Sequence, residues 1–353
     1  MNNSALFLQR LGLCYPIIQA PMAGVSTPAL AAAVSEAGGL GSLGLGANSV
    51  EQAREIIAAT QALTDKAFNV NVFCHTTPKR DSINEQRWID YLTPQFSAFN
   101  RHPPQQLNEI YRSFLDEPEM LALFLEMKPV VVSFHFNIPP KVVIEQLKAE
   151  GIYTIATATN LTEAKLIEQA GIDAIVAQGI EAGGHRGMFD VQVDDEELTT
   201  RELIDLLVQN VTLPVIAAGG IMNGQDINAT LAQGVVAAQL GTAFILCPEA
   251  AANEDYRRKL KSQDATNTAL TAAISGRPAR GIVNEFIRIA QQPNSPQAPD
   301  YPIAYDLGKQ LNAAASQAGN EGFAAHWAGQ GATQVREMSA QDLMATLVAE
   351  MKI

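Results

Sequence analysis

The sequence predicts an α/β fold, a TIM-like (β/α)8 barrel, from three observations. Eight short apolar runs of strand length recur between residues 15 and 244, and segments with helical patterning separate most of them. The runs show little strict alternation of apolar and polar residues, as expected of parallel strands covered on both faces. The segments between them carry helix start and stop signals. The predicted strands cover residues 15–22, 40–46, 68–73, 129–136, 153–159, 174–179, 214–220 and 237–244.

The helix signals follow the strands in order. Thr27 is placed to cap a helix that begins at Pro28, and Ser49 with Gln52 matches a capping box. Later helical segments end at glycine. A doubly wound open sheet is the alternative architecture, and it is weaker because no G-x-G-x-x-G motif follows the first strand.

Two segments interrupt the regular pattern. A long polar stretch, residues 74–128, follows the third strand, and a stretch of this length is typical of a lid or an inserted subdomain. Residues 251–353 lie beyond the eighth strand. We therefore expect a barrel over residues 1–250, with 74–128 as its insertion, and a mostly helical C-terminal region over 251–353 that contributes to the substrate pocket.

Composition excludes several classes of protein. The net charge is -13 and there is no basic run, which argues against a nucleic acid or an anionic membrane as partner. Cys14, Cys74 and Cys247 are far apart and form no C-x-x-C, so neither a disulfide framework nor a metal site is expected. No apolar run reaches the roughly 18 residues of a membrane span. A soluble cytoplasmic protein is the expectation.

The working face of a barrel lies at the C-terminal ends of its strands. Glycines after the seventh and eighth strands, in "AAGGI" and "QLGTAF", let backbone N–H groups approach a phosphate, and Thr242 adds a hydroxyl. The alternative is that these glycines only permit tight turns. Neutral amides end two other strands, and a second histidine, His135, ends the fourth. We expect the phosphate cradle to include Gly219, Gly220, Gly241 and Thr242.

The stretch "VAQGIEAGGHRG", residues 176–187, places one histidine in a loop poor in side chains. Gly183 and Gly184 would let the backbone pass close to a ligand and bring His185 over it. A neutral histidine accepts a proton from carbon, and a protonated one holds an anion. We expect Arg186 to form a local salt bridge instead of contacting substrate.

The tail "YPIAYDLGK" places Tyr301, Tyr305 and Lys309 at intervals of four residues, so on a helix they share one face. Two phenols and an ammonium group suit a carboxylate. The alternative is ordinary aromatic packing beside a solvated lysine. Asp306 lies off this face and is expected at the surface or as a cap.

These motifs, in this order, resemble the nitronate monooxygenases, and the tail resembles their bacterial class I members. "QAPMAG", "FNVNVF" and "QGIEAGGHRG" join the two glycine motifs in the resemblance, which covers nearly the whole chain. It implies a barrel that binds FMN and oxidises alkyl nitronates, notably propionate 3-nitronate. The oxidant would be O2 and the products a carbonyl compound and nitrite, by one-electron transfer through the flavin semiquinone and without NAD(P)H.

The resemblance also assigns roles to residues. His185 would be catalytic, and the resemblance of the tail favours substrate binding by Tyr301, Tyr305 and Lys309. His135 is a candidate substrate contact from its position at the end of the fourth strand. FMN contacts would fall on Met22, Asn71, Gln178, Gly183, Gly220, Gln239, Gly241 and Thr242, and strand-end position adds Ala20, Pro21, Gly184, Gly219 and Leu240. Two alternatives stay open. One is an NAD(P)H-dependent flavin barrel, either an enoyl-acyl-carrier-protein reductase or an NADH:quinone reductase. The other is a non-catalytic barrel that binds a phosphorylated ligand.

Overall fold

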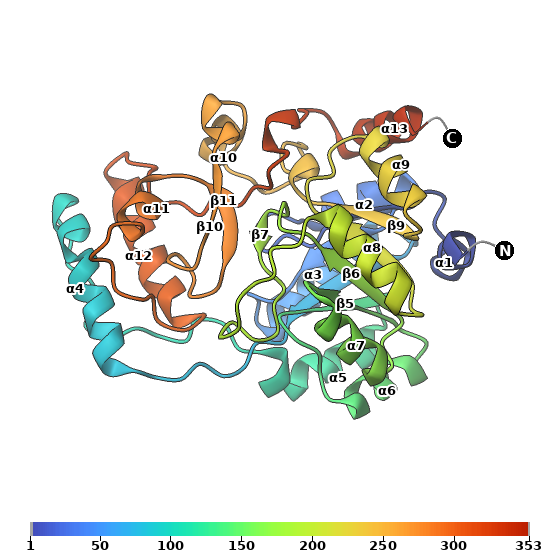
Figure 1. Ribbon diagram of the computed structural model, residues 1–353, viewed down its shortest axis with the longest axis horizontal. Coiled ribbons are helices and arrows are strands. Elements are labelled where there is room, and N and C mark those ends of the chain that lie inside the picture. The colour runs from blue at the N-terminus through green and yellow to red at the C-terminus, as the bar shows by residue number, and fades with distance from the viewer. Residues whose placement is uncertain (1–2, 352–353) are drawn as a thin grey trace.

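A closed barrel of eight parallel strands organises the computed structural model, which describes residues 3–351 (Figure 1). The strands follow the order β1-β9-β8-β6-β5-β4-β3-β2, and a parallel bridge between Ile18 and Leu40 joins the last strand to the first. All eight predicted strands are present, so the fold class is confirmed. Their bounds are β1(Ile17–Gln19), β2(Gly41–Gly44), β3(Phe68–Phe73), β4(Val131–His135), β5(Tyr153–Ala158), β6(Ala174–Gln178), β8(Val215–Ala218) and β9(Ala237–Leu240).

Helices alternate with the strands and cover the outside of the barrel. Two start signals work as the sequence predicts: Thr27 Oγ1 accepts a hydrogen bond from Leu30 N (3.0 Å), and Ser49 with Gln52 forms a capping box. The covering helices are α2(Pro28–Glu36), α3(Val50–Leu63), α5(Pro118–Met127), α6(Lys141–Ala149), α7(Leu161–Ala170), α8(Thr200–Asn210) and α9(Gly224–Ala232).

Successive side chains of each strand point to opposite faces, and this period of two places the site. On β6, Ile175 and Ala177 belong to the core beneath the helices, whereas Ala174 and Val176 belong to the barrel interior. Gln178 continues the inward series at the end of the strand. The same alternation directs the last side chain of several strands into the mouth of the barrel.

The opposite end of the barrel is closed by α1(Asn3–Leu11). Phe7 and Leu11 are buried against strand residues of the interior, and the Phe7 ring meets the Tyr153 ring edge-on at 6.0 Å. The interior is therefore filled with apolar side chains at this end, and the site lies at the other.

The end of the chain returns to the barrel. Helix α13(Ala340–Glu350) packs against α2 and α9, and Leu343 and Met344 belong to the barrel core. The sequence suggested a boundary at residue 250, with the C-terminal region beyond it. Helix α13 lies beyond that boundary but packs on the barrel. Residues 251–339 lie between the eighth strand and this last helix.

The region 251–339 is less helical than expected, because it contains an antiparallel hairpin of β10(Thr268–Thr271) and β11(Ala279–Ile282). The hairpin extends to a third strand, β7(Gly184–His185), so it pairs directly with the loop of His185. The region also holds α10(Glu254–Leu260), α11(Glu285–Ala290) and α12(Ile303–Gln317).

The long segment after β3 divides into two parts with different packing. Helix α5 joins the helices around the barrel, whereas α4(Ser82–Ala98) packs on α12 away from the strands, at the left-hand end of the molecule in Figure 1. Trp88 of α4 and Leu307 of α12 share a second hydrophobic core. Asp306 of α12, expected at the surface or as a cap, is buried and accepts hydrogen bonds from Asn108 N (2.7 Å) and Nδ2 (3.1 Å).

Within residues 3–351, no helix combines the length and the hydropathy that crossing a bilayer requires.

Candidate functional site

A cavity of about 500 Å³ opens at the C-terminal ends of the strands. This volume lies within the roughly 300–1,000 Å³ typical of small-molecule and cofactor sites. The barrel supplies most of its lining, and the region after residue 250 supplies the rest. The predicted site residues that line it are Ala20, Pro21, Met22, Asn71, His135, Gln178, Gly183, Gly184, His185, Gly219, Gly220, Gln239, Gly241, Thr242, Tyr301, Tyr305 and Lys309.

Two predicted cofactor residues have a different role in the structure. Leu240 does not line the cavity: its side chain is buried in the barrel core, and its carbonyl accepts from Ala20 N (2.8 Å). Gly183 does line it, but the reason for glycine there is the neighbouring chain, because a Cβ would come within 2.4 Å of Gly329 N. The loop of His185 is thereby packed tightly against the C-terminal region.

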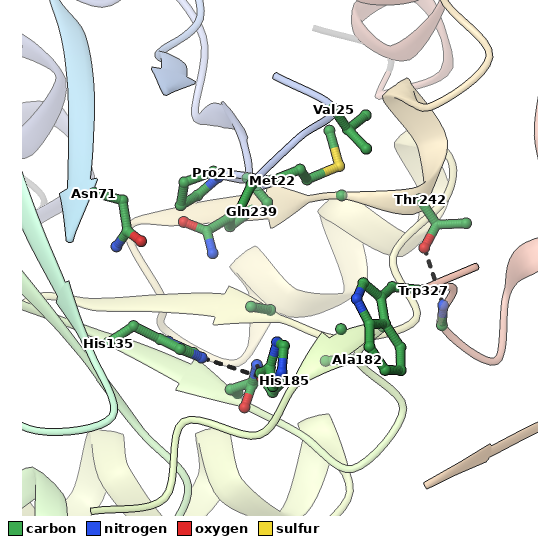
Figure 2. Close-up of a pocket in the computed structure, with 18 of the residues that line it drawn as sticks. Pro21, Met22, Val25, Asn71, His135, Ala182, His185, Gln239, Thr242 and Trp327 are labelled. Carbon is green, nitrogen blue, oxygen red and sulfur yellow. Dashed lines mark hydrogen bonds between the residues drawn. The ribbon is translucent and has the colours of Figure 1, made fainter. Parts of the chain in front are cut away.

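One side of the cavity is lined by Pro21, Met22, Gly220 and Gly241, which we call the backbone wall. Figure 2 shows Pro21 and Met22 on this side. The amide N–H groups of Gly220 and Gly241 have no acceptor among residues 3–351. A Cβ on Gly241 would lie 3.5 Å from Ala20 Cβ and would take up space at this wall. Free amides beside glycines form a cradle that suits a phosphate.

The strand-end amides divide into engaged and free groups. Gln178 Nε2 donates to the His185 carbonyl (2.9 Å), and Gln178 Oε1 accepts from Gly187 N (2.8 Å). Asn71 Nδ2 donates to Ser133 Oγ (2.9 Å). These two side chains therefore hold protein groups in place. The side-chain amide of Gln239, by contrast, has no hydrogen-bond partner among the described residues, so it is available to a ligand.

The side of the cavity opposite the backbone wall is rich in rings, and we call His185, Phe73, Tyr301, Tyr305 and Trp327 the aromatic wall. Figure 2 shows His185 and Trp327 across the cavity from Pro21 and Met22. The His185 ring centroid lies 5.3 Å from that of Trp327, 5.7 Å from Tyr301, 6.2 Å from Tyr305 and 6.4 Å from Phe73.

His185 is held by its backbone as well as by its ring. It pairs with Ala279 of β11, and Arg186 N donates to Pro278 O (2.8 Å). Arg186 itself is buried and forms the predicted local salt bridge, with Nε 2.7 Å from Asp195 Oδ2. A strand pairing and a buried ion pair therefore fix the loop that carries His185.

His135 faces the cavity, but both of its ring nitrogens are engaged by protein. Nε2 lies 3.1 Å from the His185 carbonyl, and Nδ1 lies 3.1 Å from Thr157 Oγ1. A carbonyl only accepts, so Nε2 of His135 is the donor and Nδ1 accepts from the threonine hydroxyl. The substrate contact predicted for His135 is therefore limited to its ring edge.

Burial keeps the two imidazoles neutral. It lowers the pKa of His185 to about 3, and the neighbouring His135 and Arg277 act in the same direction. Burial likewise lowers the pKa of His135 to about 4. The guanidinium of Arg277 is buried against the Phe136 ring, 4.3 Å from its centroid, and burial lowers its pKa to about 10. The cavity thus has a buried positive charge behind its two neutral imidazoles.

The predicted cluster of Tyr301, Tyr305 and Lys309 assembles at the edge of the cavity. Tyr305 and Lys309 lie on α12, and Tyr301 lies just before it. Lys309 is exposed, and its Nζ lies 4.9 Å from the ring centroid of Tyr111 and 5.5 Å from that of Tyr305. The Tyr301 hydroxyl is buried without a partner among the described residues. The ammonium group of Lys309 and the unpartnered hydroxyl of Tyr301 therefore belong to the lining of the same cavity.

Sequence reasoning missed several residues of this lining. Tyr111 comes from the insertion, and Trp327 and Tyr256 come from the C-terminal region. Ser275 and Arg277, behind His185, belong to the turn between β10 and β11. Each is an isolated residue in its segment without a motif at regular spacing, so only the three-dimensional contacts identify it. In the described part of the chain, no three His, Cys, Asp or Glu side chains gather to hold a metal.

Comparison with known proteins assigns this arrangement to a family. The family model described as nitronate monooxygenase matches residues 5–350. Nitronate monooxygenase of Paraburkholderia phytofirmans is 56% identical over 98% of this chain and 94% of its own length. Its counterpart from Pseudomonas aeruginosa is 51% identical over 98% and 99% of the two chains.

Two solved structures are also similar. Nitroalkane oxidase from Streptomyces ansochromogenes superposes with a TM-score of 0.89 at 38% identity, covering 99% of this chain and 98% of its own. FabK from Thermotoga maritima gives a TM-score of 0.74 at 29% identity, covering 98% and 96%. The chain therefore belongs to the nitronate monooxygenase family, a family of flavin-dependent oxidoreductases.

Proposed function

We propose that this protein binds FMN and oxidises alkyl nitronates with O2 to a carbonyl compound and nitrite, by a one-electron route. Propionate 3-nitronate is the proposed substrate. One observation carries the proposal: a single cavity joins the free amides of Gly220 and Gly241 to the His185 imidazole and to a lysine beside tyrosines. In this proposal the barrel binds FMN, and residues 251–339 form much of the substrate side.

The backbone wall fits FMN. The free amides of Gly220 and Gly241 suit its phosphate, and the unengaged amide of Gln239 suits the polar edge of its ring system. Pro21 and Met22 add a small, apolar surface for a flat ring. When bound, FMN would supply the one-electron oxidation and the reaction with O2.

The protein's own residues would bind and orient the substrate and compensate its negative charge. Lys309 and the tyrosines would hold the carboxylate of propionate 3-nitronate, and a hydrogen bond to a charged group contributes about 1.5–3 kcal/mol. The buried guanidinium of Arg277 favours an anion in the cavity, because charges interact more strongly where water is excluded. The rings of the aromatic wall exclude that water.

An NAD(P)H-dependent flavin reductase is the second candidate. It stays open because reductases of that class share the features "EAGGH" and "AGGI" with this sequence. The relatives at 56% and 51% identity carry the name nitronate monooxygenase, and the Tyr301, Tyr305 and Lys309 cluster suits a small carboxylate. We therefore place the nitronate reaction first.

Anaerobic mixing of the purified protein with each candidate reductant separates the two functions. The nitronate proposal expects propionate 3-nitronate to bleach the flavin absorbance and NADH or NADPH to leave it unchanged. Under air, nitrite should then accumulate with substrate consumption. Bleaching by a nicotinamide nucleotide, with none by the nitronate, would establish the reductase instead. A yellow protein that neither reductant bleaches would contradict both enzyme assignments.

A further inference from the structure

The ring of His185 is anchored by a serine that the sequence did not identify. His185 Nε2 lies 2.9 Å from Ser275 Oγ, and Ser275 is fully buried in the turn between β10 and β11. The serine hydroxyl in turn lies 3.1 Å from the carbonyl oxygen of Arg277. The hydroxyl therefore stands between an imidazole nitrogen and a backbone acceptor.

The chemistry of these three groups fixes the direction of both hydrogen bonds. A carbonyl oxygen only accepts, so the single hydroxyl hydrogen of Ser275 is donated to Arg277 O. The oxygen of Ser275 is then left with lone pairs, so it accepts from His185 Nε2–H. A neutral imidazole carries one N–H, and hence Nδ1 of His185 carries a lone pair.

Nδ1 of His185 is open to the cavity. His185 lines the cavity, and its ring contributes no atom to the buried side-chain atoms that lack a partner in the described chain. His135 differs, because protein groups engage both of its nitrogens. Of the two imidazoles at this mouth, only His185 presents a lone pair to a ligand.

We propose that Ser275 is a positioning residue that holds His185 in the Nε2–H tautomer and so directs the Nδ1 lone pair into the cavity. In this state His185 is set to accept a proton. When a neutral nitroalkane is bound, its α-carbon proton passes to Nδ1, which forms the new N–H bond. The C–H electron pair moves onto the nitro group and leaves the nitronate that the proposed function oxidises. The imidazolium that results keeps its Nε2–H on Ser275. Only the kinetic consequence rests on the function proposed above.

Nitrogen-15 NMR of the holoprotein with labelled histidine rings tests the tautomer directly. The chain has five histidines, and the His185 signals are assigned by their absence in His185→Asn. We expect wild type to show Nε2 as the protonated nitrogen and Nδ1 as the bare one. Ser275→Ala should give mixed tautomers at His185 only. A wild-type ring protonated at Nδ1, or an unchanged His185 pattern in Ser275→Ala, would overturn the proposal.

Thr157→Val is the matched control, because it removes the hydroxyl partner of the other imidazole. It should change the signals of His135 and leave the His185 tautomer intact, whereas an equal change at His185 would contradict a specific role for Ser275. Should Ser275→Ala fail to fold, Ser275→Cys retains most of the volume with a weaker acceptor and replaces it.

Kinetics give the second readout. With a neutral nitroalkane as substrate, Ser275→Ala should lower kcat/KM by about tenfold, equivalent to about 1.4 kcal/mol, mainly through kcat and with FMN content unchanged. A change in KM alone would contradict the positioning role. If the NMR result holds but no nitronate is consumed by wild type, the tautomer assignment stands and the proposed function fails.

Discussion

The two walls of the cavity are built on opposite principles. The backbone wall, at Pro21, Met22, Gly220 and Gly241, depends on the absence of side-chain atoms at its two glycines. The aromatic wall depends on side chains from distant segments that hold His185 among rings. Substitutions that add atoms should therefore damage the backbone wall, and substitutions that remove atoms should damage the aromatic wall. We expect damage to the backbone wall to lower FMN content and damage to the aromatic wall to lower turnover. The following variants test that separation.

His185→Asn should produce the largest effect. We expect FMN content to stay at the wild-type level and kcat/KM for a neutral nitroalkane to fall by roughly 10²–10⁴-fold, the usual contribution of a positioned acid or base. Flavin absorbance and oxygen consumption measure the two quantities. Unchanged turnover would show that His185 takes no part in the reaction. Loss of FMN would show that it supports cofactor binding.

Gly220→Val should break the backbone wall. Gly220 has φ +69°, and its Cβ would lie 3.2 Å from Glu181 Cβ. A branched side chain beside the cradle should leave the protein without FMN, as measured by flavin released per chain. Gly151→Val is the matched control, because Gly151 has φ +78° with open space around it and does not line the cavity. It should lower Tm and keep FMN; equal FMN in both variants would refute the cradle.

The pH dependence of stability tests the burial of four imidazole rings. Burial lowers the pKa of His185 to about 3 and those of His135, His75 and His326 to about 4. Unfolded histidine binds a proton near pH 6.5, so between that pH and pH 4 the unfolded chain binds more protons. The free energy of unfolding should therefore fall on acidification, by up to about 1.4 kcal/mol per pH unit for each group. Denaturant titrations at pH 7 and pH 5 measure it, and equal stability would contradict the neutral imidazoles.

Lys309→Met should produce the smallest effect, confined to the edge of the aromatic wall. Lys309 is exposed and lies over two tyrosine rings. Loss of one charged contact should raise KM for propionate 3-nitronate about tenfold. KM for a simple alkyl nitronate without a carboxylate serves as the control and should hardly change. A similar rise for both substrates would show that the lysine supports the wall and does not recognise the carboxylate.

The sequence predicts the backbone wall better than the aromatic wall for a physical reason. Strand ends and glycines act locally, so strand position and turn chemistry predict Gly220 and Gly241 at the cavity, and the family resemblance adds Gln239. Ser275 contacts His185 across 90 positions of sequence, and Tyr111 reaches the cavity from the insertion. Contacts of that separation leave no local pattern.

The same distinction explains the errors. Leu240 occupies a strand end, but its parity directs the side chain to the helices and into the core. Gln178 lines the cavity as predicted, but its amide is hydrogen-bonded to the His185 loop. Helix α13 carried an ordinary amphipathic pattern, and nothing in that pattern says that it returns to pack between α2 and α9.

The visible absorption spectrum of the purified protein, with identification of any chromophore it releases, tests the central claim most directly. The claim is that the backbone wall holds a flavin across the cavity from His185. A yellow protein that releases one FMN per chain is the predicted result. A colourless protein that takes up no added FMN would contradict the account.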